Sequence, residues 1–301
     1  MATTGPRLEI RLLGAFHVTL DGRRAPCGGA KRDALLAILA MNRGRPVSMD
    51  ALVEYLWSTD VPAAPRNAVH HHITRLRAAL GQESILGSSN GYALGDATTD
   101  ALVFEEMLVE ARAALRDGDA REAADLAARS LALWHGLALQ GLPETDWIRA
   151  EAGRLEELRI DAHEELFEAE LELGRHREIV SELQRAVRES PFRERLWRQL
   201  MLALYRSGRA ADALETYQSA RRVYMELGLE PSPDLRRMQQ AILAHDPAIA
   251  GLLGTLRAAA PVPLEDARDE LAHTLQLLRE KLRHAEELYE RAFPALVGIA
   301  A

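Results

Sequence analysis

The chain opens on two short segments, residues 8–12 and 16–20, in which apolar and polar side chains alternate. A period of two residues is typical of strands that bury one face. Asp21 and Gly22 follow the second segment, and an Asp-Gly pair is a strong signal for a tight hairpin turn. A further short segment lies at 23–26. The pattern therefore predicts a small antiparallel sheet at the start of the chain.

Three helices are predicted after this sheet. Residues 30–41 carry leucines at helical spacing and indicate an amphipathic helix. Ser48 is a favourable N-cap for a second helix that runs to Trp57. The third helix covers 65–80, and four apolar residues spaced four, three and four apart predict one buried stripe on it. These residues are Val69, Ile73, Leu76 and Leu80.

The opposite face of the third helix carries hydrogen-bond donors and no acid. Its polar members are Asn67, His70, His71, Thr74 and Arg75, and Arg66 and Arg77 flank them. A helix that reads base edges in the major groove needs such side chains. Beyond Gly81, two apolar segments at 85–86 and 92–94 enclose the polar turn 87–91. This pattern predicts a hairpin that would serve as a wing.

In their order of sheet, three helices and hairpin, these residues resemble the OmpR-type winged helix-turn-helix. The resemblance rests on residues 7–20, SMDALVEYLW at 48–57, NAVHHHITRLRAAL at 67–80 and GYAL at 91–94. It implies a domain at 7–97 that binds double-stranded DNA. The wing departs from the family, because Ala93 replaces a common basic residue and the turn has neither Arg nor Lys. A strong minor-groove contact by the wing is therefore not expected.

Residues 100–250 are predicted to form an all-α domain of helical repeats. Gly174 and Gly208 lie 34 residues apart, which is the tetratricopeptide period, and the segments around them align at that shift. GDAREAADLAARSL at 118–131 matches the second helix of the same unit. An irregular segment at 135–147 interrupts the register. Helix pairs of this kind bury their apolar faces by stacking and usually present a groove to a partner.

A winged helix followed by such a block resembles the bacterial transcriptional activator domain family, which includes the Streptomyces antibiotic regulatory proteins. LGLEPSPDL at 227–235 and ILAHDP at 242–247 are similar to the end of that domain. The resemblance covers about 7–248. It implies a mainly α protein that activates a biosynthetic gene cluster, binds repeated promoter sites and recruits RNA polymerase.

A heptad pattern follows beyond the resemblance, at 264–293. The first core position holds Leu264, Leu271, Leu278, Ala285 and Ala292. The second core position begins with Arg268 and then holds Leu275, Leu282 and Tyr289. The pattern predicts a C-terminal helix. Two roles remain open for it: pairing with a second copy to give a homodimer, or packing on the repeats as a cap.

The sign of the net charge changes near residue 100, where the motifs also place the boundary between the two domains. The net charge of −8 is unfavourable for a DNA binder, because attraction to phosphate dominates such affinity. Residues 1–99, however, hold 11 Lys and Arg against 8 Asp and Glu, whereas residues 100–301 hold 26 against 37. The first domain therefore has a net positive charge and can bind an anion. Lys31 and Arg32 at a helix start are candidate phosphate contacts, with ordinary solvated charge as the alternative.

Several classes of protein are not expected. The single cysteine, Cys27, excludes an internal disulfide and a cysteine-based zinc cluster. His70, His71 and His72 are consecutive, point about 100° apart on a helix and cannot converge on one metal ion. Nucleotide-binding loops, cofactor motifs and hydrolase motifs are missing, so we expect neither an enzyme nor a cofactor. Without a long apolar run or a signal core, we expect a cytoplasmic protein with no membrane contact.

Two other functions compete with promoter binding. The chain could be a tetratricopeptide scaffold whose winged helix binds a protein, or a sensor whose repeat groove holds a small molecule. The basic first domain and the donor-rich helix face argue against the scaffold. No convergent set of polar residues supports the sensor. The sequence therefore predicts a DNA-binding transcriptional regulator.

Overall fold

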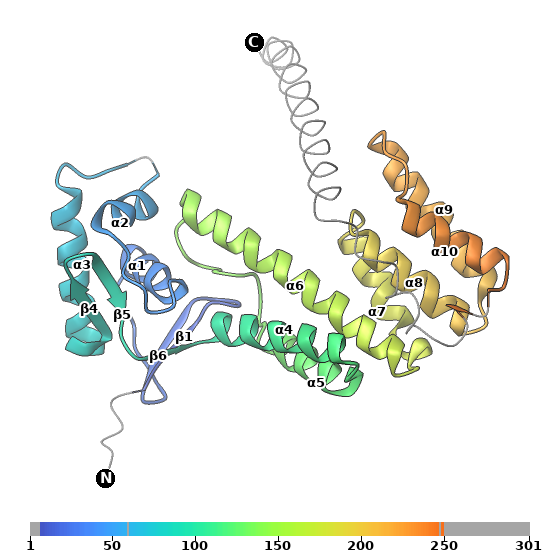
Figure 1. The fold of residues 1–301 in the computed structure, drawn as a ribbon. Helices are drawn as coiled ribbons and strands as arrows, with labels where there is room; N and C mark the ends of the chain where they lie inside the picture. The colour runs from blue at the N-terminus through green and yellow to red at the C-terminus, as the bar shows by residue number, and fades with distance from the viewer. Residues whose placement is uncertain (1–6, 59, 247, 250–301) are drawn as a thin grey trace, which may run out of the picture. The chain divides into compact units, whose positions relative to one another are not determined.

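A computed structural model describes residues 7–58, 60–246 and 248–249 (Figure 1). Within them the chain is mainly helical, with a winged helix first and an all-α domain after it, as the sequence predicted. The heptad segment at 264–293 lies outside the described residues.

The opening sheet has the strand order β3-β2-β1-β6. Strands β1 (Leu8–Arg11), β2 (His17–Leu20) and β3 (Arg23–Arg24) are antiparallel neighbours. Asp21 and Gly22 form the predicted turn, with φ of 52° and 74°. Strand β6 (Ala97–Thr99) was not predicted, because three residues are too few to show a period. It pairs in parallel with β1 and brings the end of the winged helix back to its beginning.

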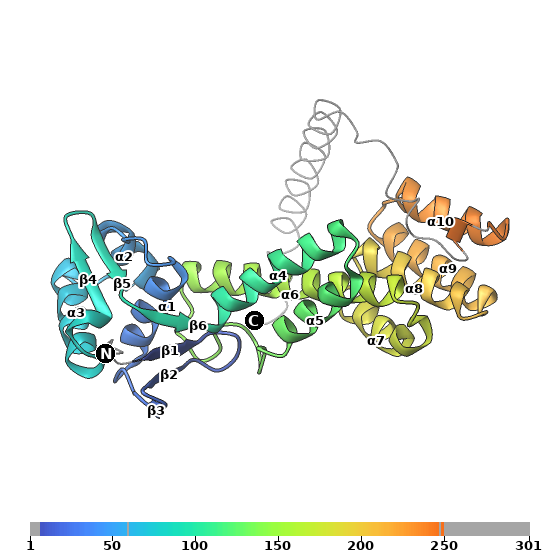
Figure 2. The same cartoon turned by 60° about the horizontal axis from the view of Figure 1, so that its bottom comes forward.

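Three helices and a hairpin complete the winged helix. Helices α1 (Ala30–Met41), α2 (Met49–Leu56) and α3 (Pro65–Leu80) have close to the expected bounds. The Ser48 hydroxyl accepts a hydrogen bond from the Ala51 amide at 3.2 Å, as expected of an N-cap. The one-turn helix η1 (Gln82–Ser84) leads into the hairpin of β4 (Ile85–Ser88) and β5 (Gly91–Leu94). Figure 2 shows this hairpin beside α3.

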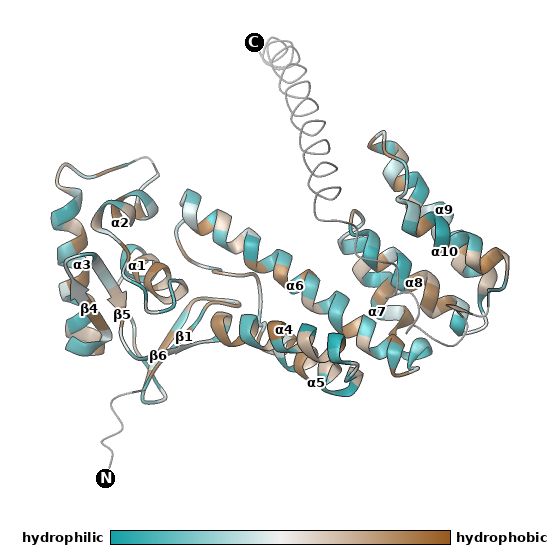
Figure 3. Cartoon of the chain, in the orientation of Figure 1, coloured by the Kyte–Doolittle hydropathy of each residue, from teal (hydrophilic) through white to brown (hydrophobic). Residues whose placement is uncertain are grey.

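Helix α1 differs from the amphipathic helix that we expected. Residues 34–40 are all buried, so this stretch has no solvent-facing side. Figure 3 shows the hydropathy of these residues along the α1 ribbon. Helices α2 and α3 and strands β5 and β6 all contact it. Alanines fill the positions that a surface helix would give to polar residues, so the neighbours pack closely around α1. Helix α1 is therefore the centre of the winged-helix core.

The second domain consists of helices that contact their neighbours in sequence (Figure 1). They are α4 (Asp100–Asp117), α5 (Ala120–Leu131), α6 (Asp146–Glu172), α7 (His176–Glu189), α8 (Glu194–Arg206), α9 (Ala210–Glu226) and α10 (Pro233–Leu243). The three glycines that suggested a repeat occupy equivalent turns. Gly118, Gly174 and Gly208 have φ of 82°, 80° and 81°, a conformation that glycine adopts at low cost. In each turn the next helix begins two residues later, which confirms the repeat register.

Arginine–carboxylate pairs join the first helices of the repeats. Asp161 on α6 accepts from Arg112 on α4 at 2.8 Å and from Arg193, just before α8, at 3.1 Å. Arg195 donates to both carboxylate oxygens of Glu165 at 2.8 and 3.1 Å. These arginine side chains are 29–38% exposed, so the pairs are partly shielded from solvent. Polar contacts therefore supplement apolar packing between the repeats.

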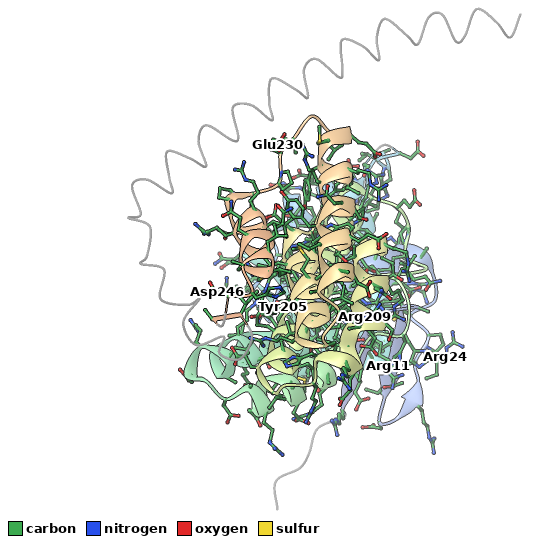
Figure 4. All side chains as sticks on the ribbon, turned by 90° about the vertical axis from the view of Figure 1, so that its right-hand side faces the viewer. Arg11, Arg24, Tyr205, Arg209, Glu230 and Asp246 are labelled. Carbon is green, nitrogen blue, oxygen red and sulfur yellow. The ribbon has the colours of Figure 1, made fainter. Side chains whose placement is uncertain are left out.

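The last described residues fold back onto α8. The rings of Tyr205 and His245 stack with their centroids 6.5 Å apart, and Tyr205 lies near Asp246 in Figure 4. One residue further along α8, Arg206 donates from Nε to the Ile249 carbonyl at 2.9 Å. The end of the described chain is thus anchored to the repeats.

The irregular segment between α5 and α6 is a strap, residues 135–141, that connects the two domains. Its backbone hydrogen-bonds the loop that follows β1: the His135 amide donates to the Leu13 carbonyl at 2.8 Å and the Leu139 amide to the Leu12 carbonyl at 2.7 Å. The Phe16 amide donates in return to the Gln140 carbonyl at 2.9 Å. A side chain at Gly14 would meet the strap at 3.2 Å, so glycine allows this close approach.

Asp100, the first residue of α4, makes the second polar link. Its carboxylate accepts hydrogen bonds from the backbone amides of Leu12 at 2.7 Å, Leu13 at 3.2 Å and Ala101 at 2.8 Å. Burial raises the pKa of this carboxyl group, and the three amide donors oppose that shift. Beside it, one hydrophobic cluster runs from the sheet and α1 through Phe104 and Trp134 to α6. The described residues thus form one compact unit, in which the winged helix and the helical domain share this hydrophobic cluster.

We predict that Asp100→Asn lowers the free energy of unfolding by about 1–3 kcal/mol, because the amide NH₂ would face a backbone donor and leave it unpaired. Chemical denaturation of the full chain measures the effect. Asp96→Asn is the matched control, since Asp96 is exposed and its side chain makes no hydrogen bond in the described part of the chain. Equal stability of the two variants would contradict a structural role for Asp100.

Candidate nucleic-acid interface

Helix α3 separates an apolar face from a polar one, as its sequence predicted. Val69, Ile73, Leu76 and Leu80 are at most 2% exposed and face α1, α2 and the hairpin. The five polar residues of the opposite face are all exposed: Asn67, His70, His71, Thr74 and Arg75. Buried leucine, isoleucine and valine anchor the helix, so its polar face is held on a rigid support.

Arg75 and Asn67 are free to bind a partner. Neither side chain makes a hydrogen bond or ion pair within the part of the chain that the structure describes. Arginine carries five donors in a planar fork, and asparagine carries two donors and an acceptor. A partner that presents paired acceptors would therefore meet no competing internal contact at these two positions.

Arg66 has a neighbour that the sequence did not reveal. Its guanidinium lies 2.5 Å from a carboxylate oxygen of Asp50, which belongs to α2. Both side chains are well exposed, so the pair contributes little to stability. The face of α3 is acid-free along the helix itself, but Asp50 lies beside its first turn. Arg66 remains a candidate phosphate contact that would have to leave Asp50.

Arg77 connects α3 to the hairpin. Its Nε and Nη2 atoms both donate to the Ile85 carbonyl, at 3.0 and 2.8 Å, and its guanidinium carbon lies 5.8 Å from the centroid of the Tyr92 ring. The side chain is half-buried. This geometry gives Arg77 a structural role beyond the flanking position that the sequence indicated, and its contact with DNA stays a prediction.

The three consecutive histidines have different surroundings. His70 places Nδ1 2.8 Å from the Tyr92 hydroxyl, whereas the ring of His72 stacks on Trp57 with the centroids 6.4 Å apart. His71 is exposed. Burial lowers the pKa of His72, and the charges of Arg32, His71 and Lys31 lower it further. Among the described residues, no group of three or more His, Cys, Asp and Glu side chains is arranged to hold a metal ion.

Lys31 and Arg32 lie at the start of α1, close to His72. The Lys31 ammonium donates to the Leu56 carbonyl at 2.5 Å and lies 5.5 Å from the centroid of the Trp57 ring. It therefore caps the C-terminal end of α2. Burial lowers the pKa of Lys31, and Asp60 opposes that shift. The Arg32 guanidinium packs over Gly28, where an added Cβ would lie 2.6 Å from Nη2. Sequence reasoning missed both internal contacts, and phosphate binding by this pair stays a prediction.

The hairpin is held by a backbone bridge to Val47, two residues before α2 begins. The Val47 amide donates to the Tyr92 carbonyl at 2.7 Å, and the Tyr92 amide donates to the Val47 carbonyl at 3.0 Å. Gly91 makes this approach feasible, because a Cβ there would lie 1.9 Å from the Val47 oxygen. Its φ of 128° also favours glycine. The GYAL segment therefore forms the hairpin and also fastens it to the helices.

Comparison with known proteins agrees with this architecture. Residues 28–92 match the family described as transcriptional regulatory protein, C terminal, and residues 99–243 match the bacterial transcriptional activator domain. Regulatory protein DnrI of Streptomyces peucetius is 34% identical over 256 residues, which cover 80% of this chain and 94% of DnrI. The chain belongs to the Streptomyces antibiotic regulatory protein family. It is a transcriptional regulator, as the sequence predicted.

The chain spans only part of the length of some relatives. Regulatory protein AfsR of Streptomyces coelicolor is 36% identical over 265 residues, which cover 87% of this chain but 27% of AfsR. A solved structure of Mycobacterium tuberculosis EmbR, in complex with a low affinity phosphopeptide, superposes with a TM-score of 0.78 at 31% identity. The match covers 91% of this chain and 71% of the EmbR chain. No helix in the described part of this family member is long and apolar enough to cross a membrane.

We predict that Gly91→Ala lowers the free energy of unfolding by roughly 3 kcal/mol, from backbone strain together with loss of the Val47 hydrogen bonds. Gly44→Ala is the control, because Gly44 also has a positive φ, 70°, but a Cβ there meets no atom within 4 Å. It isolates the backbone strain, about 1 kcal/mol. Thermal denaturation of both variants measures the difference, and similar losses would refute the steric role of Gly91.

Proposed function

We propose that this family member is a sequence-specific DNA-binding transcriptional activator whose helix α3 enters the major groove. The observation that carries the proposal is the exposed polar face of α3, on which Arg75 and Asn67 make no internal contact. The arginine fork matches the O6 and N7 acceptors of guanine, and an asparagine amide matches the N6 and N7 edge of adenine. His70, His71 and Thr74 complete the reading surface.

The flanking cations set the register on the duplex. Arg66, Lys31 and Arg32 bind phosphates. Arg77 holds α3 against the hairpin through the Ile85 carbonyl, and its positive charge adds to the attraction for phosphate. Phosphate contacts position a protein without reading sequence, so their loss weakens binding to all duplexes alike. The hairpin turn at 87–91 lacks cations, and the wing therefore contributes little to the minor groove.

The helical domain recruits RNA polymerase, and the target promoters belong to a biosynthetic gene cluster. Membership of the regulator family supports this part of the proposal. The net negative charge of residues 100–301 keeps this domain away from the phosphates and leaves its surface to a protein partner. The heptad pattern at 264–293 has two candidate roles in this function: it pairs two copies that bind repeated promoter sites, or it caps the repeats.

We predict that Arg75→Ala reduces discrimination at one base position by about 1–3 kcal/mol, because a forked pair of hydrogen bonds to the base is lost. Binding of the full chain to a selected duplex and to a scrambled one, each at two salt concentrations, measures the effect. The control is Arg116→Ala, which removes the same charge from an exposed and unpaired position on α4.

Each outcome of this experiment has a clear meaning. A loss confined to the selected duplex supports base reading by Arg75, and a steep salt dependence of the wild-type chain supports DNA binding itself. Equal losses on both duplexes would make Arg75 a phosphate contact. Weak, salt-independent binding of the wild-type chain would instead favour the protein scaffold.

We predict that removing the residues after Ala260 leaves the repeats folded, and that the mass falls from dimer to monomer if the heptads pair two copies. Sedimentation equilibrium of the full and truncated chains measures the mass, and far-ultraviolet circular dichroism monitors the fold. An unchanged mass would reject the segment as a dimerisation element and leave its role as a cap.

A further inference from the structure

Tyr92 lies where the hairpin meets the polar face of α3. Its backbone is fixed by the two hydrogen bonds with Val47, and its ring lies beside the Arg77 guanidinium. Arg77 is itself held by two hydrogen bonds to the Ile85 carbonyl. The phenol group is therefore supported from its backbone and from its ring, and it has little freedom to move.

The Tyr92 hydroxyl contacts one residue of the proposed reading surface. It lies 2.8 Å from Nδ1 of His70, and the two rings meet edge to face with their centroids 6.0 Å apart. His70 is exposed, and its Nε2 has no hydrogen-bond partner among the described residues. One ring nitrogen of His70 is thus occupied by the protein, and the other is left for a partner.

The partner of one imidazole nitrogen decides what the other can do. In a neutral histidine one nitrogen donates and the other accepts, and a hydrogen bond to the first selects the tautomer. The Arg77 cation beside the Tyr92 ring draws electron density from the phenol and makes its hydroxyl a better donor. If Tyr92 donates its hydroxyl proton to Nδ1, the ring proton of neutral His70 lies on Nε2.

We propose that Tyr92 is a positioning residue that holds His70 as the Nε2–H tautomer, so that His70 donates one hydrogen bond to a base in the major groove. The proposal rests on the proposed function, in which α3 enters that groove. Guanine, adenine and thymine all present an acceptor there, whereas the cytosine edge presents the N4 donor. His70 thus rejects cytosine at one operator position, and Tyr92 makes that rejection effective.

Binding selection with the full chain tests the proposal. A pool of random 30-base-pair duplexes defines the preferred site, and the four bases are then compared at each position. We expect the wild-type chain to bind cytosine about tenfold more weakly than the best base at the position where His70→Ala relaxes the preference. Tyr92→Phe, which keeps the ring beside Arg77, should lose most of this difference.

The double variant separates positioning from a general effect on the fold. If Tyr92 acts through His70, Tyr92→Phe should change nothing further in the His70→Ala background. Independent, additive losses would overturn the proposal. Tyr55→Phe is the matched control, because Tyr55 stacks on Trp147, away from the α3 face, and its hydroxyl makes no hydrogen bond in the described part of the chain. It should leave base preference unchanged.

The tautomer is observable directly. Nitrogen-15 chemical shifts of the His70 ring in the full chain should show a protonated Nε2 and an unprotonated Nδ1, and Tyr92→Phe should shift the population towards a mixture. A protonated Nδ1 in the wild-type chain would overturn the proposal. If the wild-type chain selects a sequence but Tyr92→Phe still rejects cytosine, only this inference fails. If the wild-type chain selects no sequence, the proposed function fails as well.

Discussion

The polar face of α3 depends on a backbone bridge between Val47 and Tyr92. Two hydrogen bonds join the hairpin to Val47, two residues before α2, and they form because Gly91 has no side chain that would collide with the Val47 carbonyl. On the hairpin side, the Tyr92 hydroxyl contacts His70 of α3. On the helix side, Arg77 of α3 donates to the Ile85 carbonyl of the hairpin. The hairpin thus supports the helix from the side, although its own turn carries no cation. In this chain the wing serves as a structural support for α3.

The two domains are joined more firmly than their separate motifs suggest. The strap at 135–141 and the Asp100 carboxylate both bind the backbone of the loop after β1, and the same apolar cluster runs beneath them. Backbone amides in such a place would be costly to leave unpaired, so the contacts between the domains form and break together.

Charge is distributed to suit this arrangement. In the helical domain, arginines such as Arg112 and Arg195 are paired with carboxylates of neighbouring helices. On α3, by contrast, Arg75 is unpaired within the described residues. Repulsion between the acidic domain and a bound duplex is screened beyond about 8–10 Å at physiological salt. Local pairing and screening together reconcile a net charge of −8 with the proposed binding of α3 to nucleic acid.

The sequence by itself determined the local elements. Apolar periodicity located α1, α2 and α3, the Asp21-Gly22 pair located the turn, and the spacing of Gly174 and Gly208 established the repeat. These features depend on residues close together in the chain. Only the tertiary structure decided which side chains of the candidate site are free. Lys31 binds Leu56, Arg66 binds Asp50 and Arg77 binds Ile85, and each partner comes from another element that no period or motif connects to it. The role of Asp100 was hidden for the same reason, because a hydrogen bond across 88 residues leaves no pattern in the chain, and strand β6 was too short to show a period.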